Sequence, residues 1–240
     1  AAALYTSHTG LLGSDGLIPP PAAATADLFS QDLPDDVGDE PNTTSDRFYR
    51  SQDIWVRNQQ DGITNQEHQN PVYRATGPPN FVYVRVRNRG CSDATAATLR
   101  LYWAKASTGL SWPAPWDGSV TSPALMGQAI GDQSTGAVAS GGSTILEFAW
   151  SPPNPADYAS FGADAPHFCL LSRIETDAAS PFGMTFPEGT DLGANVRDNN
   201  NMAEGFPALI IARLFGFKSA AFFEIELASQ RAAPQVDLET

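Results

Sequence analysis

Hydrophobic and polar residues alternate along several short stretches of the chain, and each stretch predicts a β-strand. The clearest runs from Phe81 to Arg89, where the valines at 82, 84 and 86 share one side. A period of two indicates an extended strand with one buried face, because successive side chains point to opposite faces. Further strands are predicted at 53–57, 98–103, 143–150, 168–175, within 199–211 and at 221–227.

The predicted strands each offer an apolar face that we expect to be buried. Besides the three valines, these faces comprise Leu99, Leu101, Trp103, Leu146, Phe148, Trp150, Phe168, Leu170 and Ile174. About seven strands separated by Gly- and Pro-rich turns, without a convincing helical period, favour an all-β fold. We therefore predict an immunoglobulin-like antiparallel β-sandwich with long loops at 58–80, 104–142 and 154–166.

The ends of the chain lack the pattern of the middle. Residues 1–45 show no sustained period and contain three consecutive prolines at 19–21 and an acidic run at 32–40. Such a composition is typical of an extended spacer. We predict an extended N-terminal arm at 1–45, the sandwich at 46–212, and a C-terminal strand and tail at 213–240.

Charge narrows the classes of partner. The 240 residues carry 14 basic and 27 acidic side chains, a formal net charge of −13, and only two of the basic residues are lysines. A field of this sign repels phosphate backbones, so we expect no nucleic-acid partner. No apolar run approaches the roughly 20 residues that span a bilayer, so we also expect no membrane span. The chain begins with alanine, which fits a cleaved secretory signal and equally a shortened chain.

Four short motifs occur in the order found in a known family. They are Val-Arg-Val-Arg-Asn-Arg-Gly at 84–90, the aromatic-ended strand at 97–103, Gly-Gly-Ser-Thr at 141–144 leading to Trp-Ser-Pro-Pro at 150–153, and Asn-Asn-Asn-Met-Ala at 199–203. In this order the chain resembles the bacterial cell-adhesion-related CARDB domains over residues 81–212. The resemblance implies an immunoglobulin-like, extracellular, non-catalytic accessory role and brings no catalytic residues. Longer loops at 104–142 and 154–166 depart from the family.

Catalytic motifs are missing from the sequence. His8, His68 and His167 share no metal-ligand spacing, and neither a nucleophile elbow nor a Walker loop occurs. We therefore expect no enzyme, no catalytic residues and no cofactor.

Calcium is the one metal that the loops suggest. Carboxylates and carbonyls cluster at 32–40 and at 191–201, where Asp191, Asp198 and Asn199 are candidate ligands. The alternative is turn chemistry, since Asp and Asn are common wherever a turn needs left-handed backbone.

Two surfaces are candidates for ligand contact. Trp112 and Trp116 lie in a Pro-stiffened loop that suits sugar stacking or protein contact, unless both rings fold over an open end of the sandwich. Arg85, Arg87 and Arg100 are predicted on the outer face of one sheet. Their expected partner is the acidic run at 32–40, from the same chain or a second copy, and the alternative is an acidic glycan.

Cys91 and Cys169 are the only cysteines. In a secreted sandwich such a pair often forms a disulfide, here one that holds a turn over a sheet edge. The alternative is two separate small apolar residues. We favour the disulfide.

Together these features favour a secreted or cell-surface module that binds or adheres to a protein or glycan surface. The alternative is a self-assembling structural subunit whose terminal segments pair with the edge of another copy. A glycan-active enzyme ranks behind both, because a fold alone does not define a function.

Overall fold

The computed structural model describes residues 26–33, 36–38, 51–106, 111–175 and 189–196 in full, and the backbone of 197–198 and 202–205. The predicted strand at 221–227 lies outside these residues. The strands are β1 (Leu28–Phe29), β2 (Ile54–Arg57), β3 (Asn80–Asn88), β4 (Thr98–Lys105), β5 (Gly127–Ser134), β6 (Ser143–Trp150), β7 (Phe168–Glu175) and β8 (Met202–Gly205). A 3-10 helix, η2 (Pro155–Asp164), precedes β7, and a short helix, α2 (Leu192–Asp198), precedes β8.

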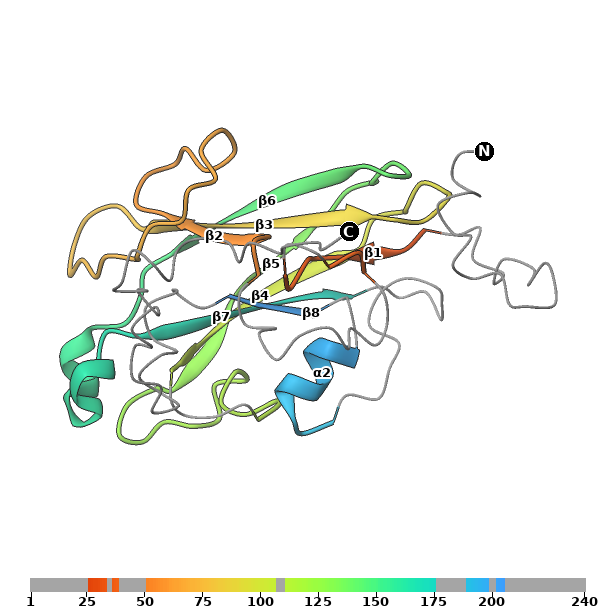
Figure 1. Cartoon of the computed structure of the whole chain (residues 1–240). Helices are drawn as coiled ribbons and strands as arrows, with labels where there is room; N and C mark the ends of the chain where they lie inside the picture. Colours follow the sequence, from red (N-terminus) through yellow and green to blue (C-terminus); the bar gives the residue numbers. More distant parts are fainter. Residues whose placement is uncertain are drawn as a thin grey trace, which may run out of the picture. The chain divides into compact units, whose positions relative to one another are not determined.

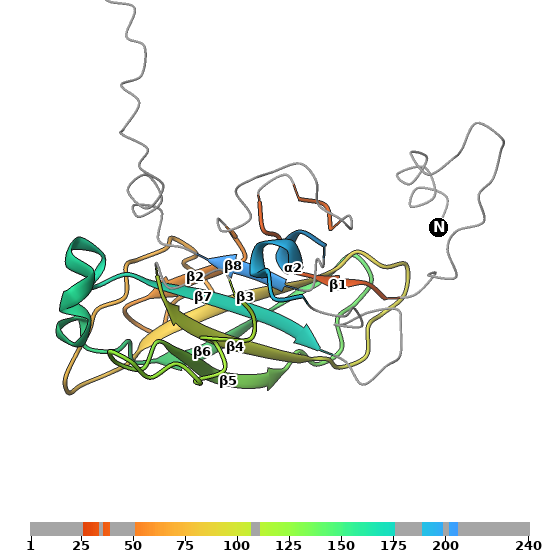
Figure 2. The same cartoon turned by 90° about the horizontal axis from the view of Figure 1, so that it is seen from below.

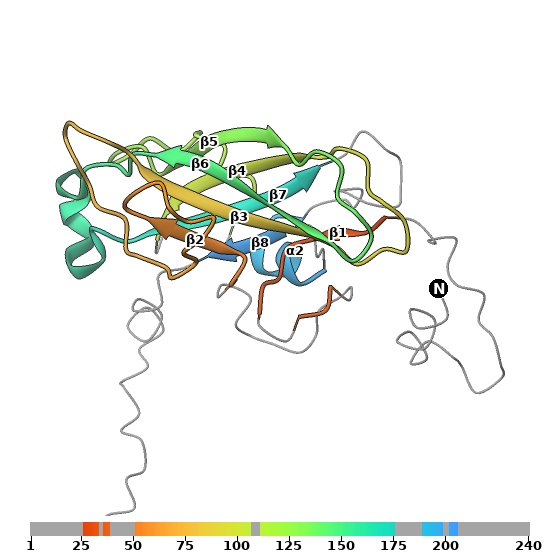
Figure 3. The same cartoon turned by 90° about the horizontal axis from the view of Figure 1, so that it is seen from above.

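The strands form two antiparallel sheets, which confirms the predicted all-β sandwich. In the first sheet, β3 pairs with β6 on one side and with both β1 and β2 on the other. The second sheet has the order β5-β4-β7-β8. Figures 1 and 3 show the two sheets stacked, with β3 and β6 over β4 and β7.

The core lies between the sheets, on the faces that the alternation predicts. Val82 pairs with Phe148 and Val84 with Leu146, so β3 and β6 present their apolar residues together. From the second sheet, Leu99, Leu101, Trp103, Leu170 and Ile174 join the same buried cluster. Each fully buried side chain of this size contributes about 1.5–3 kcal/mol relative to exposure. This burial outweighs weak local preferences and holds the register of the strands.

The predicted loop at 104–142 contains a strand, β5, which the sequence pattern missed. Its residues are mostly polar and exposed, because β5 is an edge strand with one face in solvent. Gly127 sits where backbone segments crowd together: a Cβ there would lie 2.7 Å from the carbonyl oxygen of Pro115 and 2.8 Å from that of Trp103. Glycine therefore permits β5 to approach β4.

The N-terminal boundary of the sandwich also differs from the prediction. β1 lies inside the predicted arm, pairs with Asn88 and Arg87 of β3, and buries Leu28 fully in the core. Two residues are too few to show a period, so alternation carries no strand signal here. Residues 28–29 of the predicted arm thus belong to the first sheet.

The outer face of the second sheet is covered as well. Tyr102, Ala104, Cys169 and Leu171 pack beneath Trp116 and beneath Leu192 and Val196 of α2, forming a second buried cluster. Figure 2 shows α2 beside β8 on this face. No helix among the described residues is long and apolar enough to cross a membrane.

Candidate functional site

A pocket of about 380 Å³ opens at one end of the sandwich, and we call it the end pocket. Its aromatic lining is Trp103 from β4, Trp150 from β6 and Tyr158 from η2. Its polar lining is Gln128, Ser151, Asn154 and Asp157, and the other lining residues are Ala124, Leu125, Ala129, Ile130 and Pro153. The volume lies within the range of about 300–1,000 Å³ that ligand pockets occupy.

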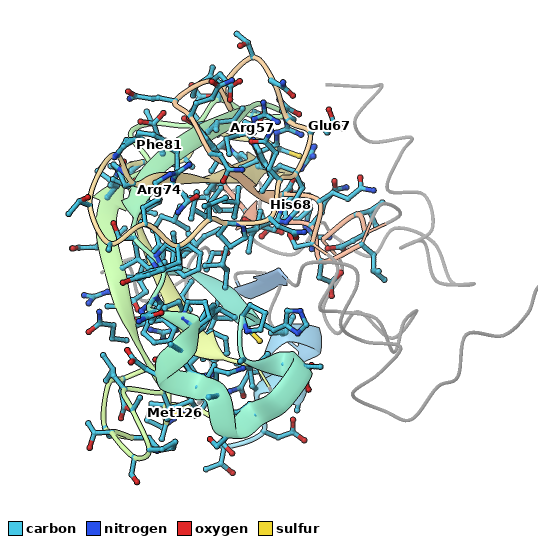
Figure 4. The ribbon with its side chains drawn as sticks, turned by 90° about the vertical axis from the view of Figure 1, so that its left-hand side faces the viewer. Arg57, Glu67, His68, Arg74, Phe81 and Met126 are labelled. Atoms are coloured by element: carbon cyan, nitrogen blue, oxygen red, sulfur yellow. The ribbon has the colours of Figure 1, made fainter. Side chains whose placement is uncertain are left out.

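The chain builds this pocket by ending a strand abruptly. Trp150 is the last residue of β6, and the prolines at 152, 153 and 155 prevent the strand from continuing. Asn154 then caps η2 by accepting a hydrogen bond from the backbone N–H of Ala156 at 3.1 Å. The hydroxyl of Tyr158 donates to the carbonyl of Leu125, which ties η2 to the segment before β5. Figure 4 shows this end of the molecule, with Met126 beside η2.

The aromatic lining belongs to a larger ring cluster around Phe168. Its ring meets those of Trp103, Trp150 and Tyr158 edge to face, with centroids 5.5, 6.4 and 5.3 Å apart. Such pairs are favourable because the positive edge of one ring faces the negative face of another. The cluster therefore holds the pocket's rings in fixed positions.

A buried lysine lies against the same cluster. The Lys105 ammonium donates to the carbonyl oxygens of Asp164 at 2.7 Å and His167 at 2.9 Å, and lies 4.8 Å from the ring centroid of Phe161. Burial lowers the pKa of Lys105 to about 8. The sequence analysis missed this residue. The signal was present, because Lys105 follows Trp103 by two residues in the same strand and so points to the same inner face, where a charged side chain is unusual.

Two pocket groups lack partners in the described structure. The indole nitrogen Nε1 of Trp150 is buried and has no hydrogen-bond partner among the described residues. Asp157 is exposed at the rim, and no hydrogen bond or ion pair of its carboxylate occurs in that part of the chain. Buried donors are nearly always satisfied in proteins, so an orphaned one calls for an explanation.

The two rings of the tryptophan loop differ in burial, and ligand contact by this loop stays a prediction. Trp116 is buried, 1% exposed, against the outer face of the second sheet, where its own chain covers the ring. Trp112 is half-buried, meets Tyr102 edge to face at 5.6 Å, and lies 4.7 Å from the Arg173 guanidinium. The rings cover a sheet face rather than an open end, because the loop bridges to Asp191 and Thr190 beside α2.

The three arginines do not share a sheet, which corrects the prediction. Arg85 and Arg87 lie on β3 of the first sheet, whereas Arg100 lies on β4 of the second. Arg100 pairs with Glu175 across the β4–β7 ladder, Nε to Oε2, at 2.7 Å. Alternation places a side chain on one face of a strand but says nothing about which strands pair.

Asp53, not the acidic run, is the main partner of the β3 arginines. Its buried carboxylate accepts two hydrogen bonds from Arg87 and lies 3.7 Å from Arg85 Nη1. The hydrogen bond to Asp53 raises the pKa of Arg87, and the charge of Asp36 adds a smaller effect. Asp36 from the acidic run is thus near Arg87, while residues 34, 35, 39 and 40 lie outside the described part.

The candidate calcium ligands do not form a site in the described residues. Asp191 caps α2, where its carboxylate accepts a hydrogen bond from the Ala194 N–H at 3.0 Å. Asp198 ends α2 with only its backbone described, and Asn199 lies outside the described residues. Across the described ranges no group of three His, Cys, Asp or Glu side chains could hold a metal ion. Calcium binding stays a prediction.

The predicted disulfide is not formed. Cys91 is exposed in the turn after β3, and Cys169 is buried in β7. Cys169 pairs with Ala104 near the end of β4, whereas the turn with Cys91 lies by Ala94, before the start of β4 at Thr98. The six residue steps of β4 from Thr98 to Ala104 lie between the two cysteines along the strand direction and span roughly 20 Å. A disulfide requires Cα atoms within about 7 Å of each other.

The loop at 58–69 covers the outer face of the first sheet. Trp55 stacks on Tyr83 at 5.6 Å, and Gly62 lies so close that a Cβ there would meet the Tyr83 ring at 2.1 Å. Arg57 binds Asp61 through two hydrogen bonds and donates a third to the Glu67 carbonyl. Figure 4 shows Arg57, Glu67 and His68 gathered where this loop folds over β2. The loop therefore covers the part of this face around Trp55 and Tyr83.

Comparisons with known proteins add no family. No protein-family profile matches the chain, and neither does any curated protein. Among solved structures, a β-glucosidase from Streptomyces venezuelae is similar at 16% identity, covering 46% of this chain and 13% of its own, with a TM-score of 0.23. A β-glucosidase from Chaetomella raphigera is similar at 17% identity, covering 50% of this chain and 16% of its own, with a TM-score of 0.25. The protein AsqI, crystallised with zinc, is similar at 11% identity, covering 72% of this chain and 33% of its own, with a TM-score of 0.29.

The chain thus spans a third or less of the length of each of these three structures. With TM-scores below 0.5 the likenesses carry no argument about function.

Proposed function

We propose that this chain is a non-catalytic, extracellular binding module of the immunoglobulin-like, CARDB-like kind, and that the end pocket is its ligand-contact site. The observation that carries the proposal is the pocket itself. It combines an exposed carboxylate and amides at the rim with walls formed by rings that are 1–4% exposed and are held by the Phe168 cluster. A concave site with an apolar floor and a few convergent polar groups is the usual form of a ligand site.

The rigidity of the pocket supports binding. Its walls come from the ends of β4 and β6, from η2 and from the segment before β5, and these are joined through Tyr158 and Leu125. A preformed site loses little conformational entropy when it takes a ligand, so more of the contact energy is available for affinity.

Blocking the pocket tests this function. The protein would be screened on arrays of glycans and extracellular proteins, with Ala129→Trp as the blocked variant because Ala129 is an exposed lining residue. The control is Ala139→Trp, the same change at an exposed site next to Gly142, at the opposite end of β6 from Trp150. We expect Ala129→Trp to abolish a signal that Ala139→Trp retains. Equal signals for both variants would contradict the proposal, and so would turnover of the bound probe.

A self-assembling subunit is the second candidate, and one observation favours it. β5 ends its sheet, so one side of its backbone has no strand partner among the described residues and could pair with a segment of another copy. Light scattering of the purified chain separates the two candidates. Concentration-dependent growth of the particle mass supports assembly, and a constant monomer mass rejects it.

A further inference from the structure

Residues 71–79, just before β3, form a loop that we call the 71–79 loop. In Figures 1 and 3 this gold-coloured part of the chain projects past the ends of β2 and β3. Of the five large hydrophobic side chains that are exposed in the described ranges, two are consecutive here: Val72 is 43% exposed and Tyr73 is 39% exposed. Isolated exposed apolar residues are ordinary, but adjacent ones on a projecting loop mark a candidate contact surface.

A buried side chain holds the loop in place. Asn80, 1% exposed at the start of β3, accepts a hydrogen bond from the Val72 N–H and donates one to the Val72 carbonyl, both at 2.9 Å. Its Nδ2 also lies 3.4 Å from the carbonyl oxygen of Trp150, which ties the loop to the end of β6. Prolines at 71, 78 and 79 restrict the backbone further. Because Val72 is positioned in advance, a partner meets little entropy cost of ordering the loop.

The next residue, Arg74, adds a charge without a counter-charge. Six of the seven arginine side chains in the fully described ranges lie within 3.7 Å of a carboxylate oxygen, namely Arg57, Arg85, Arg87, Arg89, Arg100 and Arg173. Arg74 is the seventh, and in those ranges its Nη1 reaches only the Pro78 carbonyl and Asn80 Oδ1, each at 3.4 Å. Figure 4 shows Arg74 at this end of the molecule. A guanidinium in this state favours a partner that brings a carboxylate.

We infer that the 71–79 loop is a docking site for a second protein, whose surface receives Val72 and Tyr73 in an apolar pocket and pairs a carboxylate with Arg74. Tyrosine and arginine are enriched where the binding energy of protein interfaces concentrates. Because the loop projects, the partner must supply the concave side, and folded proteins do so. Another copy of this chain is disfavoured, since two molecules of net charge −13 repel each other.

This docking site is distinct from the end pocket. None of residues 71–79 lines that pocket, so either surface can bind without the other. The inference therefore goes beyond the proposed function.

Selection from a phage-displayed library of random peptides on the full-length protein tests the chemistry of this surface. We expect the enriched peptides to combine large apolar residues with Asp or Glu, because Val72 and Tyr73 need apolar contacts and Arg74 needs a carboxylate. Enrichment of basic peptides, or of none, would overturn the inference.

Tyr73→Ala should weaken the enriched peptides by roughly tenfold or more, as for other aromatic residues at the centre of an interface. The matched control is Val120→Ala, which shortens a side chain that is 37% exposed on another loop and should leave the affinity unchanged. Both substitutions lie at the surface, so the unfolding midpoint should stay the same. Equal affinity for wild type and Tyr73→Ala would reject the docking site.

Arg74→Gln separates the charge from the apolar contact. It should weaken binding about fivefold and reduce the dependence of the affinity on salt, because the lost ion pair is the part that salt screens. Arg100→Gln removes an equal charge that already has Glu175 as its partner, and it should keep the salt dependence of wild type. Identical salt dependence in wild type and Arg74→Gln would contradict the carboxylate pairing.

Other outcomes point to other occupants and overturn the inference. A glycan signal on the arrays that requires Tyr73 would assign the loop to a glycan, and a particle mass in light scattering that falls on Tyr73→Ala would assign it to a second copy. The two proposals also fail separately. A protein signal on the arrays that Tyr73→Ala loses and Ala129→Trp keeps supports the docking loop and counts against the end pocket, whereas the reverse pattern supports the end pocket alone.

Discussion

Arg87 holds the buried carboxylate of Asp53 by two parallel hydrogen bonds, Nε to Oδ2 at 2.7 Å and Nη2 to Oδ1 at 2.8 Å. The same carboxylate accepts from the backbone N–H of Gln31 at 2.9 Å, and its side chain is fully buried. Asp53 therefore joins the segment after β1 to the centre of the first sheet. Its position between β1 and β2 makes it a structural clip rather than a ligand site.

Asp53→Asn should destabilise the fold by about 3 kcal/mol. It leaves Arg87 without its counter-charge, and breaking a buried pair costs roughly 3–5 kcal/mol, less where one partner still reaches water, as Arg87 does. Urea unfolding of both proteins measures the loss. Arg100→Gln is the control, since Arg100 is half-exposed and its pair with Glu175 should contribute below about 1 kcal/mol. Equal losses of stability in the two variants would show that the buried Asp53–Arg87 pair contributes no more than an exposed surface pair.

Leu28→Ala tests whether the N-terminal segment belongs to the sandwich. Leu28 is fully buried, so its truncation should lower the free energy of unfolding by about 2–5 kcal/mol through lost burial and a new cavity. Val37→Ala changes an exposed residue of the same segment and should cost less than about 0.5 kcal/mol. An unchanged unfolding midpoint for Leu28→Ala would mean that β1 is not docked in solution.

The two thiols should react at very different rates. Cys91 is exposed and Cys169 is buried, so a thiol reagent added to the native protein should label one group quickly and the second only after unfolding. Cys91→Ser should remove the fast phase and keep the slow one. Absence of any reactive thiol in unfolded, unreduced protein would restore the disulfide.

Tyr83 should make the stability fall at alkaline pH. Burial raises the pKa of Tyr83 to about 12, above the ordinary value of ~10. The folded state therefore keeps its proton when the unfolded state has lost it. This contribution is fully present below pH 10 and is lost as the pH rises to about 12. In urea unfolding at several pH values, the difference between wild type and Tyr83→Phe should be constant to pH 9 and then shift against the wild type. A difference that stays flat through pH 12 would contradict burial of the phenol.

Local alternation was sufficient to predict four of the strands and their buried faces, but it missed β1 and β5. The pattern of β3, β4, β6 and β7 predicts both the residue ranges and the buried sides, because side-chain direction follows from the extended backbone itself. Lone aromatic and charged residues are less informative. Trp116 looks equally suited to a ligand surface or to a core until the structure shows α2 packed beside it.

Only the tertiary structure decided how these strands meet. It places Arg100 and Arg87 in different sheets and makes Asp53 the partner of Arg87. It also brings Trp103, Trp150 and Tyr158, which lie on three different elements, together around the end pocket. Pairing and pocket formation depend on contacts between residues far apart in the chain. For β3, β4, β6 and β7 the sequence itself determined where the strand forms and which side is apolar, because those properties arise within a few neighbouring residues. The partners and the pocket arise from packing the whole sandwich, where burial of one apolar face selects a single arrangement of the strands.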